Sequence, residues 1–104
     1  MGGEKEPTDR KAFPLPVRAE LNYNERMPTV LRAGPYRFFF YASDRDEPRH
    51  VHVEREDKIA KFWLDPVRLQ TSGGFSRAEM GRIRDLVEEH REDLMEAWDE
   101  YFHG

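Results

Sequence analysis

The chain contains no cysteine among its 104 residues, which excludes disulfide bonds and thiolate metal sites. A lack of cysteine also fits a reducing compartment, so we expect a cytoplasmic protein. The opening residues, MGGEKEPTDRKAF, lack the apolar core of a secretion signal. No apolar run approaches the roughly 20 residues that cross a bilayer. These absences predict a small protein with no membrane partner.

The residues that are present describe one polar domain. Charged residues make up 37% of the chain, hydrophobic residues 38% and aromatic residues 12%. The aromatic share supplies enough apolar area for a core, which argues against a disordered chain. Charge is uneven, since residues 76–104 hold nine acidic and four basic side chains. Such an acidic end can face a partner or can simply be solvated.

Residues 1–26 differ from the rest of the chain. They contain three prolines and show neither helical nor strand periodicity. We expect a flexible N-terminal arm or extension that is dispensable for folding. The composition changes at Met27, and residues 27–104 are expected to form a single α+β domain.

Short strand-like segments follow Met27. Their spacing, with turn residues between them, predicts an antiparallel β-meander of about four strands. A hairpin bend is expected near Glu56 and Asp57, and Asp65-Pro66 should end the last full strand. The expected strands are residues 28–32, 36–43, 49–56 and 58–64, with 67–70 as a short edge segment.

A helical pattern begins at Ser76. SRAE is a capping box, in which Ser76 accepts from the backbone of Glu79 and the Glu79 side chain reaches back. Apolar residues then recur every three or four positions up to Phe102, and we expect Trp98, Tyr101 and Phe102 to form core or partner contacts. An unbroken helix would be about 42 Å long, more than a small sheet can cover. We therefore predict one long helix or, with a break in residues 88–93, two consecutive helices on one sheet face.

Strand alternation assigns the two faces of the sheet, because successive side chains point to opposite sides. The helices require the apolar face. The residues expected there are Val30, Phe38, Phe40, Val51, Val53, Phe62 and Leu64. The opposite face is expected to carry Arg37, Phe39, Tyr41, His50, His52, Glu54, Lys61 and Trp63.

The segment RHVHVERE places two of the four histidines on that opposite face, which we expect to be open to solvent. Histidine titrates near neutrality, so His50 and His52 could exchange protons with a ribose 2′-hydroxyl and a leaving oxygen. With Glu54 they form the predicted catalytic set. Arg37 or Lys61 could stabilise the charge of the reacting phosphate. The competing interpretation is that strand histidines decorate a solvated surface.

Two further interpretations stay open. His50 and His52 could bind a metal ion together with Glu54 or an aspartate from the 44–47 loop. Alternatively the face could bind RNA without chemistry, with bases stacked on Tyr41 or Trp63 and phosphates on Arg37 and Lys61. The loop SGG lacks the lysine and spacing of a nucleoside-triphosphate loop.

Several blocks of the chain resemble the bacterial family of domains of unknown function DUF4160. They are MPTVLRAGPYRFFFYASDRDEPRHVHVERE, AKFWLDPVRL, LVEEHRE and AWDEYF, and together they run from Met27 to Phe102. Where members often have Asp-Gly at the hairpin, this chain reads REDK. The resemblance implies a toxin-like component of a type II toxin–antitoxin pair, partnered by a small antitoxin-like protein of the DUF2442 kind.

Residues and resemblance together lead to two hypotheses. The first is a toxin-like protein that cleaves RNA by metal-independent histidine chemistry and needs no cofactor. The second is a non-catalytic protein-interaction or RNA-binding module that regulates through its cognate small partner.

Overall fold

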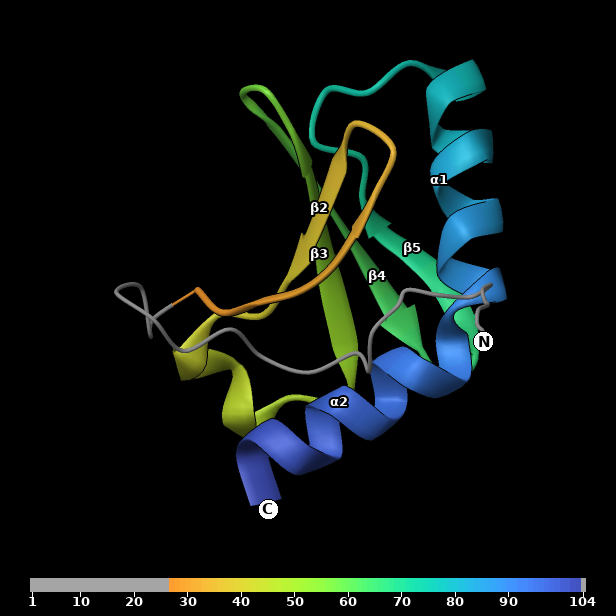
Figure 1. The fold of residues 1–104 in the computed structure, drawn as a ribbon. Coiled ribbons are helices and arrows are strands. Elements are labelled where there is room, and N and C mark those ends of the chain that lie inside the picture. The colour runs from red at the N-terminus through yellow and green to blue at the C-terminus, as the bar shows by residue number, and fades with distance from the viewer. Residues whose placement is uncertain (1–26, 104) are drawn as a thin grey trace, which may run out of the picture.

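Five antiparallel strands form one sheet in which neighbours along the chain are neighbours in space (Figure 1). The structure is a computed structural model and describes residues 27–103. The predicted arm, residues 1–26, lies outside the described residues. The sheet confirms the predicted α+β meander and adds a full fifth strand. In order, the strands are β1 (Thr29–Ala33), β2 (Tyr36–Phe39), β3 (His50–Arg55), β4 (Lys58–Leu64) and β5 (Val67–Thr71).

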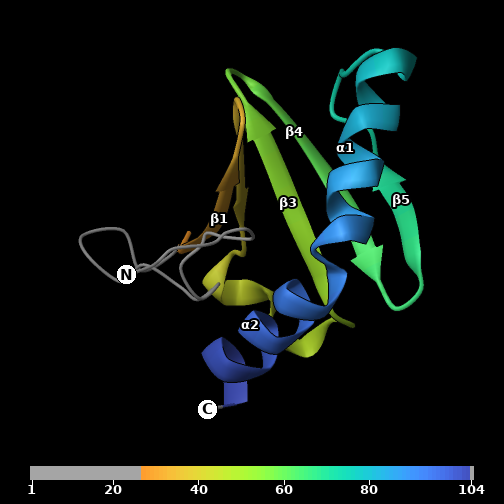
Figure 2. The same cartoon turned by 45° about the vertical axis from the view of Figure 1, so that its right-hand side comes forward.

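Three helical segments complete the fold. A short 3-10 helix, η1 (Ala42–Asp46), connects β2 to β3, and α1 (Arg77–Glu89) is followed directly by α2 (Arg91–His103). The break at His90 lies within the predicted interval. It lets α1 run beside the sheet while α2 crosses the end where β3 begins (Figures 1 and 2). Within residues 27–103 no helix is long and apolar enough to cross a membrane.

The start of α1 confirms half of the predicted capping box. Ser76 Oγ accepts from the backbone N–H of Glu79 at 3.1 Å. The Glu79 carboxylate does not reach back as predicted. It accepts instead from the Tyr36 hydroxyl at 2.8 Å and from Arg55 Nη1 at 2.6 Å. These two bonds lower the pKa of Glu79 and fasten α1 to β2 and β3.

The helices cover one face of the sheet, as predicted. Every residue assigned to that face is buried there, which confirms the alternation argument. The helices supply the other half of this core. Their buried side chains are Ile83 and Val87 from α1, and Leu94, Ala97, Trp98 and Phe102 from α2.

The strand register places the predicted functional residues on the opposite face. Phe39 pairs with His52, and His52 in turn pairs with Lys61. His50 pairs with Trp63 at the end of the sheet nearest α2. Since paired residues on neighbouring strands point to the same side, the predicted residues that lie on strands share a face, whereas Tyr41 follows the end of β2.

The hairpin between β3 and β4 departs from ordinary turn chemistry. Glu56 has a φ of 59°, a conformation that L-residues other than Asn and Asp rarely adopt. The register across the turn is intact, since Arg55 pairs with Lys58 and Glu54 with Ile59.

Candidate functional site

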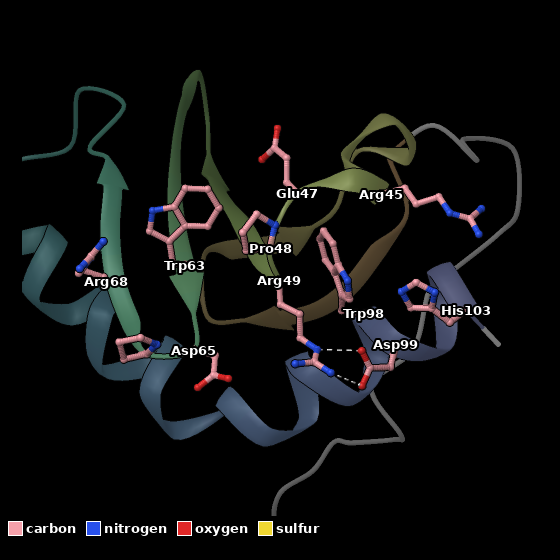
Figure 3. Close-up of a pocket in the computed structure, with 11 residues that line it drawn as sticks. Arg45, Glu47, Pro48, Arg49, Trp63, Asp65, Arg68, Trp98, Asp99 and His103 are labelled. Carbon is pink, nitrogen blue, oxygen red and sulfur yellow. Dashed lines mark hydrogen bonds and ion pairs between the residues drawn. The ribbon is translucent and has the colours of Figure 1, made fainter.

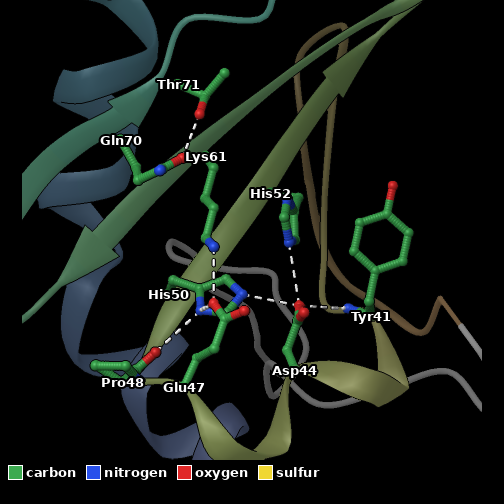
Figure 4. A network of polar contacts seen from close by, with 9 residues as sticks. All are labelled: Tyr41, Asp44, Glu47, Pro48, His50, His52, Lys61, Gln70 and Thr71. Carbon is green, nitrogen blue, oxygen red and sulfur yellow. Dashed lines mark hydrogen bonds and ion pairs between the residues drawn. The ribbon is translucent and has the colours of Figure 1, made fainter.

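The two strand histidines share one carboxylate oxygen. Asp44 Oδ2 lies 2.8 Å from His50 Nε2 and 3.1 Å from His52 Nε2 (Figure 4). The same oxygen accepts from the backbone N–H of Tyr41 at 3.1 Å. The sequence predicts a carboxylate from the 44–47 loop only as an alternative metal ligand, and the structure identifies it as Asp44.

The helix η1 explains how Asp44 reaches β3. The Asp44 N–H donates to the Tyr41 carbonyl at 2.9 Å, and the Glu47 N–H donates to the Asp44 carbonyl at 3.0 Å. These tight turns fold the segment between β2 and β3 back toward the first residues of β3. The Asp44 side chain therefore points at the histidines and is itself buried.

The histidine cluster, meaning Asp44, His50 and His52, is not an open surface. His50 has no exposed area, and His52 and Asp44 are each 8% exposed. The His50 ring centroid lies 4.9 Å from the Trp98 ring and 5.6 Å from the Trp63 ring. The prediction of exposed histidines is therefore wrong, because alternation gives the side of a strand but not what covers it. A fully buried imidazole cannot touch a phosphate directly.

Burial and hydrogen bonding set the charge of the cluster. Burial alone would raise the pKa of Asp44, but bonds from His50 and from the Tyr41 N–H outweigh it and lower that pKa overall. Burial, followed by the electrostatic effect of His50, lowers the pKa of His52 despite the opposing effect of Asp44. At neutral pH the cluster therefore contains an ionised Asp44 and a neutral His52.

Arg37 and Glu54 bind each other. Arg37 Nη1 lies 2.7 Å from Glu54 Oε1, and its other nitrogens donate to Thr29 Oγ1 at 2.6 Å and to the Met27 carbonyl at 2.7 Å. The guanidinium also lies over the Phe39 ring, 4.4 Å from its centroid. Both predicted groups are thus occupied within the sheet. The carboxylate that meets the histidines is that of Asp44.

Lys61, Trp63 and Tyr41 surround the cluster. Lys61 Nζ lies 2.7 Å from Glu47 Oε1 and 4.7 Å from the centre of the Trp63 ring. The Tyr41 ring packs edge-on against His52, with centroids 4.6 Å apart. All three keep part of their surface exposed, so they remain able to contact a ligand.

A pocket of about 910 Å³ opens beside the cluster, between the loop before β3, the turn from β4 to β5, and α2 (Figure 3). Trp63 and Trp98 form part of its wall. His50 contacts both rings from behind, so the buried cluster adjoins this pocket. The sequence assigns Trp98 to the core or to a partner contact. It is a core residue that also lines the pocket.

The pocket carries two arginines whose charge is not balanced locally. Each acid that lines it already binds another cation: Asp99 binds Arg49 at 2.8 and 2.9 Å, Glu47 binds Lys61 at 2.7 Å, and Asp65 binds Arg91 at 2.9 Å. Among residues 27–103, Arg45 and Arg68 have no acidic partner. Both are exposed, so the pocket can attract an anion.

Sequence reasoning misses these arginines for a plain reason. Arg45 lies in η1 and Arg68 in β5, 23 residues apart, and no periodicity connects them. The available signal was the pairing of Arg68 with Trp63, which required the register of a strand predicted only as an edge segment.

Comparison with known proteins adds the family. No curated protein and no solved structure matches the chain. The model of the family described as domain of unknown function (DUF4160) matches residues 36–99, from the start of β2 into α2. Because this match covers more than half of the sequence, the chain belongs to the DUF4160 family.

Proposed function

We propose that the chain is the toxin-like component of a bacterial type II toxin–antitoxin pair, and that it binds single-stranded RNA in the cytoplasm. The main support for RNA binding is the pocket in which Arg45 and Arg68 lie beside Trp63 and have no acidic partner among residues 27–103. The toxin role rests on the resemblance described above, which covers the strands and helices that build this pocket.

The pocket has the chemistry that unpaired RNA requires. Arginine side chains meet phosphates with several donors at once, and exposed aromatic rings stack on bases of any sequence. Its volume lies within the range of about 300–1,000 Å³ that holds small ligands, so one nucleotide fits. Lys61, which binds Glu47 of the pocket lining, also lies over the Trp63 ring.

Replacing Arg45 and Arg68 together by glutamine should weaken RNA binding about tenfold or more. Two lost phosphate contacts should also reduce the slope of log affinity against log salt by about 1.4, since each single-strand contact contributes roughly 0.7. A labelled mixed-sequence oligoribonucleotide and the full chain, titrated by fluorescence anisotropy at several salt concentrations, provide the measurement.

The matched control is the Arg32→Gln/Arg84→Gln variant, which removes two exposed arginines from β1 and α1, outside the pocket. An equal loss of RNA affinity in both variants would show that RNA is held by general charge attraction, and would refute binding in the pocket. Electrophoresis of the same RNA, with His52→Ala beside the parent, tests cleavage. Cleavage that depends on His52 would make the chain an endoribonuclease, whereas intact RNA would make it a binding module.

A second function, binding of a cognate small protein, is favoured by the edge of the sheet. β5 pairs only with β4, and Leu69 on it is 39% exposed, the one large exposed apolar residue among residues 27–103. A terminal strand that carries an exposed apolar side chain suits the addition of a partner strand.

Co-expression with the neighbouring gene's product should yield a complex that survives purification. Leu69→Asp should weaken it at least tenfold, because a charge replaces the apolar contact. Gln70→Asp, one position along the same strand, changes charge equally and should leave the complex intact. Failure of the parent to form a complex at micromolar concentration would count against the toxin–antitoxin pairing.

A further inference from the structure

The histidine cluster brings three possible metal-ligand atoms close together. Asp44 Oδ2, His50 Nε2 and His52 Nε2 all lie within 4.8 Å of one another. Two of the three separations are 2.8 and 3.1 Å. Metal–ligand bonds of about 2.0–2.2 Å place neighbouring donors about 2.8–3.1 Å apart at right angles and about 3.3–3.6 Å apart at tetrahedral angles. The two separations therefore match right-angled coordination as well as hydrogen bonds, and tetrahedral coordination requires the donors to move apart by a few tenths of an ångström.

The second nitrogen of His50 limits what can lie between His50 Nε2 and Asp44. His50 Nδ1 lies 3.0 Å from the Pro48 carbonyl and 3.5 Å from Glu47 Oε1, and both oxygens can only accept. Nδ1 must therefore carry a hydrogen. In the neutral ring Nε2 then has a lone pair aimed at the Asp44 carboxylate. Two facing lone pairs require a positive centre between them.

That centre is either a second proton on His50 or a metal ion. A backbone carbonyl that accepts from the far nitrogen is the usual way in which a metal-binding histidine is oriented. Two imidazoles and one carboxylate are also a recurrent ligand set for first-row transition metals. We propose that Asp44, His50 and His52 bind one divalent transition-metal ion such as Zn²⁺.

The assignment changes the role of the histidines. The sequence favours metal-independent proton transfer, whereas the geometry makes both rings ligands. Three protein ligands leave a coordination position for water, the arrangement of catalytic rather than structural zinc sites. Such an ion would act as a Lewis acid behind the wall of the pocket. The proposal does not depend on RNA binding, since neither Arg45 nor Arg68 is a ligand.

Titration of the chelator-stripped, full-length chain with Zn²⁺ should show one ion per chain by calorimetry. At a hundredfold excess over Kd, Tm should rise by about 10 °C or more. Co²⁺ should bind with a visible absorption band. Mg²⁺ should cause no shift, because imidazole ligands do not suit it.

His52→Ala should bind Zn²⁺ at least a hundredfold more weakly, while His103→Ala, an exposed histidine outside the cluster, should bind like the parent. If His52→Ala does not fold, Asp44→Asn and His52→Gln, checked by circular dichroism, replace it. The absence of heat and of a Tm shift with Zn²⁺, Co²⁺ and Ni²⁺ would overturn the proposal. So would parent-like affinity in the folded cluster variants, and either result would leave a cluster held by hydrogen bonds only.

Discussion

His50→Ala should lower the melting temperature by more than about 10 °C, measured in the presence of a chelator so that no metal contributes. Removing the group that lies against a buried carboxylate costs about 3–5 kcal/mol, because the carboxylate stays buried without compensation. For a domain of this size each kcal/mol shifts Tm by about 4–8 °C. The group left behind is the Asp44 carboxylate, which is 8% exposed and whose Oδ2 lies 2.8 Å from His50 Nε2.

Two variants make this prediction specific. His103→Ala removes an exposed imidazole and should change stability by less than about 0.5 kcal/mol. His50→Gln keeps a donor that can face Asp44 and should recover part of the loss. A His50→Ala protein that melts within a few degrees of the parent would show that the Asp44–His50 contact contributes little to the fold.

The sequence alone leads to the opposite expectation for His50. Alternation correctly places Val51 and Val53 in the core and both histidines on the other side. It does not reveal that the chain covers the second side as well. That covering comes from η1 and α2, whose contacts with β3 join residues 6 to 48 positions apart. No local period encodes such contacts, so the sequence predicts that the two histidines share a face but not what surrounds them.

The fold itself was more predictable than the site. Ser76 and the apolar period predict where α1 begins, and helix length against sheet size predicts the break found at His90. These features depend on neighbours within a few residues. Contacts between distant residues could not be predicted in this way. The Glu79 carboxylate is an example, because Tyr36 and Arg55, both distant in sequence, bind it in place of the local backbone. Arg37 and Glu54 are a second example, since each was predicted to face a ligand, whereas in the structure they bind each other.

Trp98 connects the core to the pocket. It is 2% exposed, and its ring lies 5.2 Å from Phe40, 4.4 Å from Phe102 and 4.9 Å from His50 between centroids. The same ring lines the pocket together with Trp63. One side chain therefore fixes the position of α2 and the shape of the proposed RNA site.

Trp98→Ala should destabilise the domain by about 3–5 kcal/mol, the usual cost of removing a buried tryptophan, and lower Tm by at least about 12 °C. Trp98→Phe keeps an aromatic ring against Phe40 and Phe102 and should retain most of the stability. Thermal melts followed by circular dichroism, with RNA anisotropy on the variants that stay folded, give both readouts.

Trp63→Ala is the matched control, because it removes the other tryptophan of the pocket from a half-buried position on β4. It should lose RNA affinity by about 1–3 kcal/mol, the contribution of one stacked base, while losing much less stability than Trp98→Ala. The two variants thus separate packing from binding. If Trp63→Ala binds RNA like the parent, bases do not stack in this pocket. The RNA binding of the parent would then come from charge alone. If Trp98→Ala keeps the parent's melting temperature, α2 is held to the sheet by contacts other than this ring.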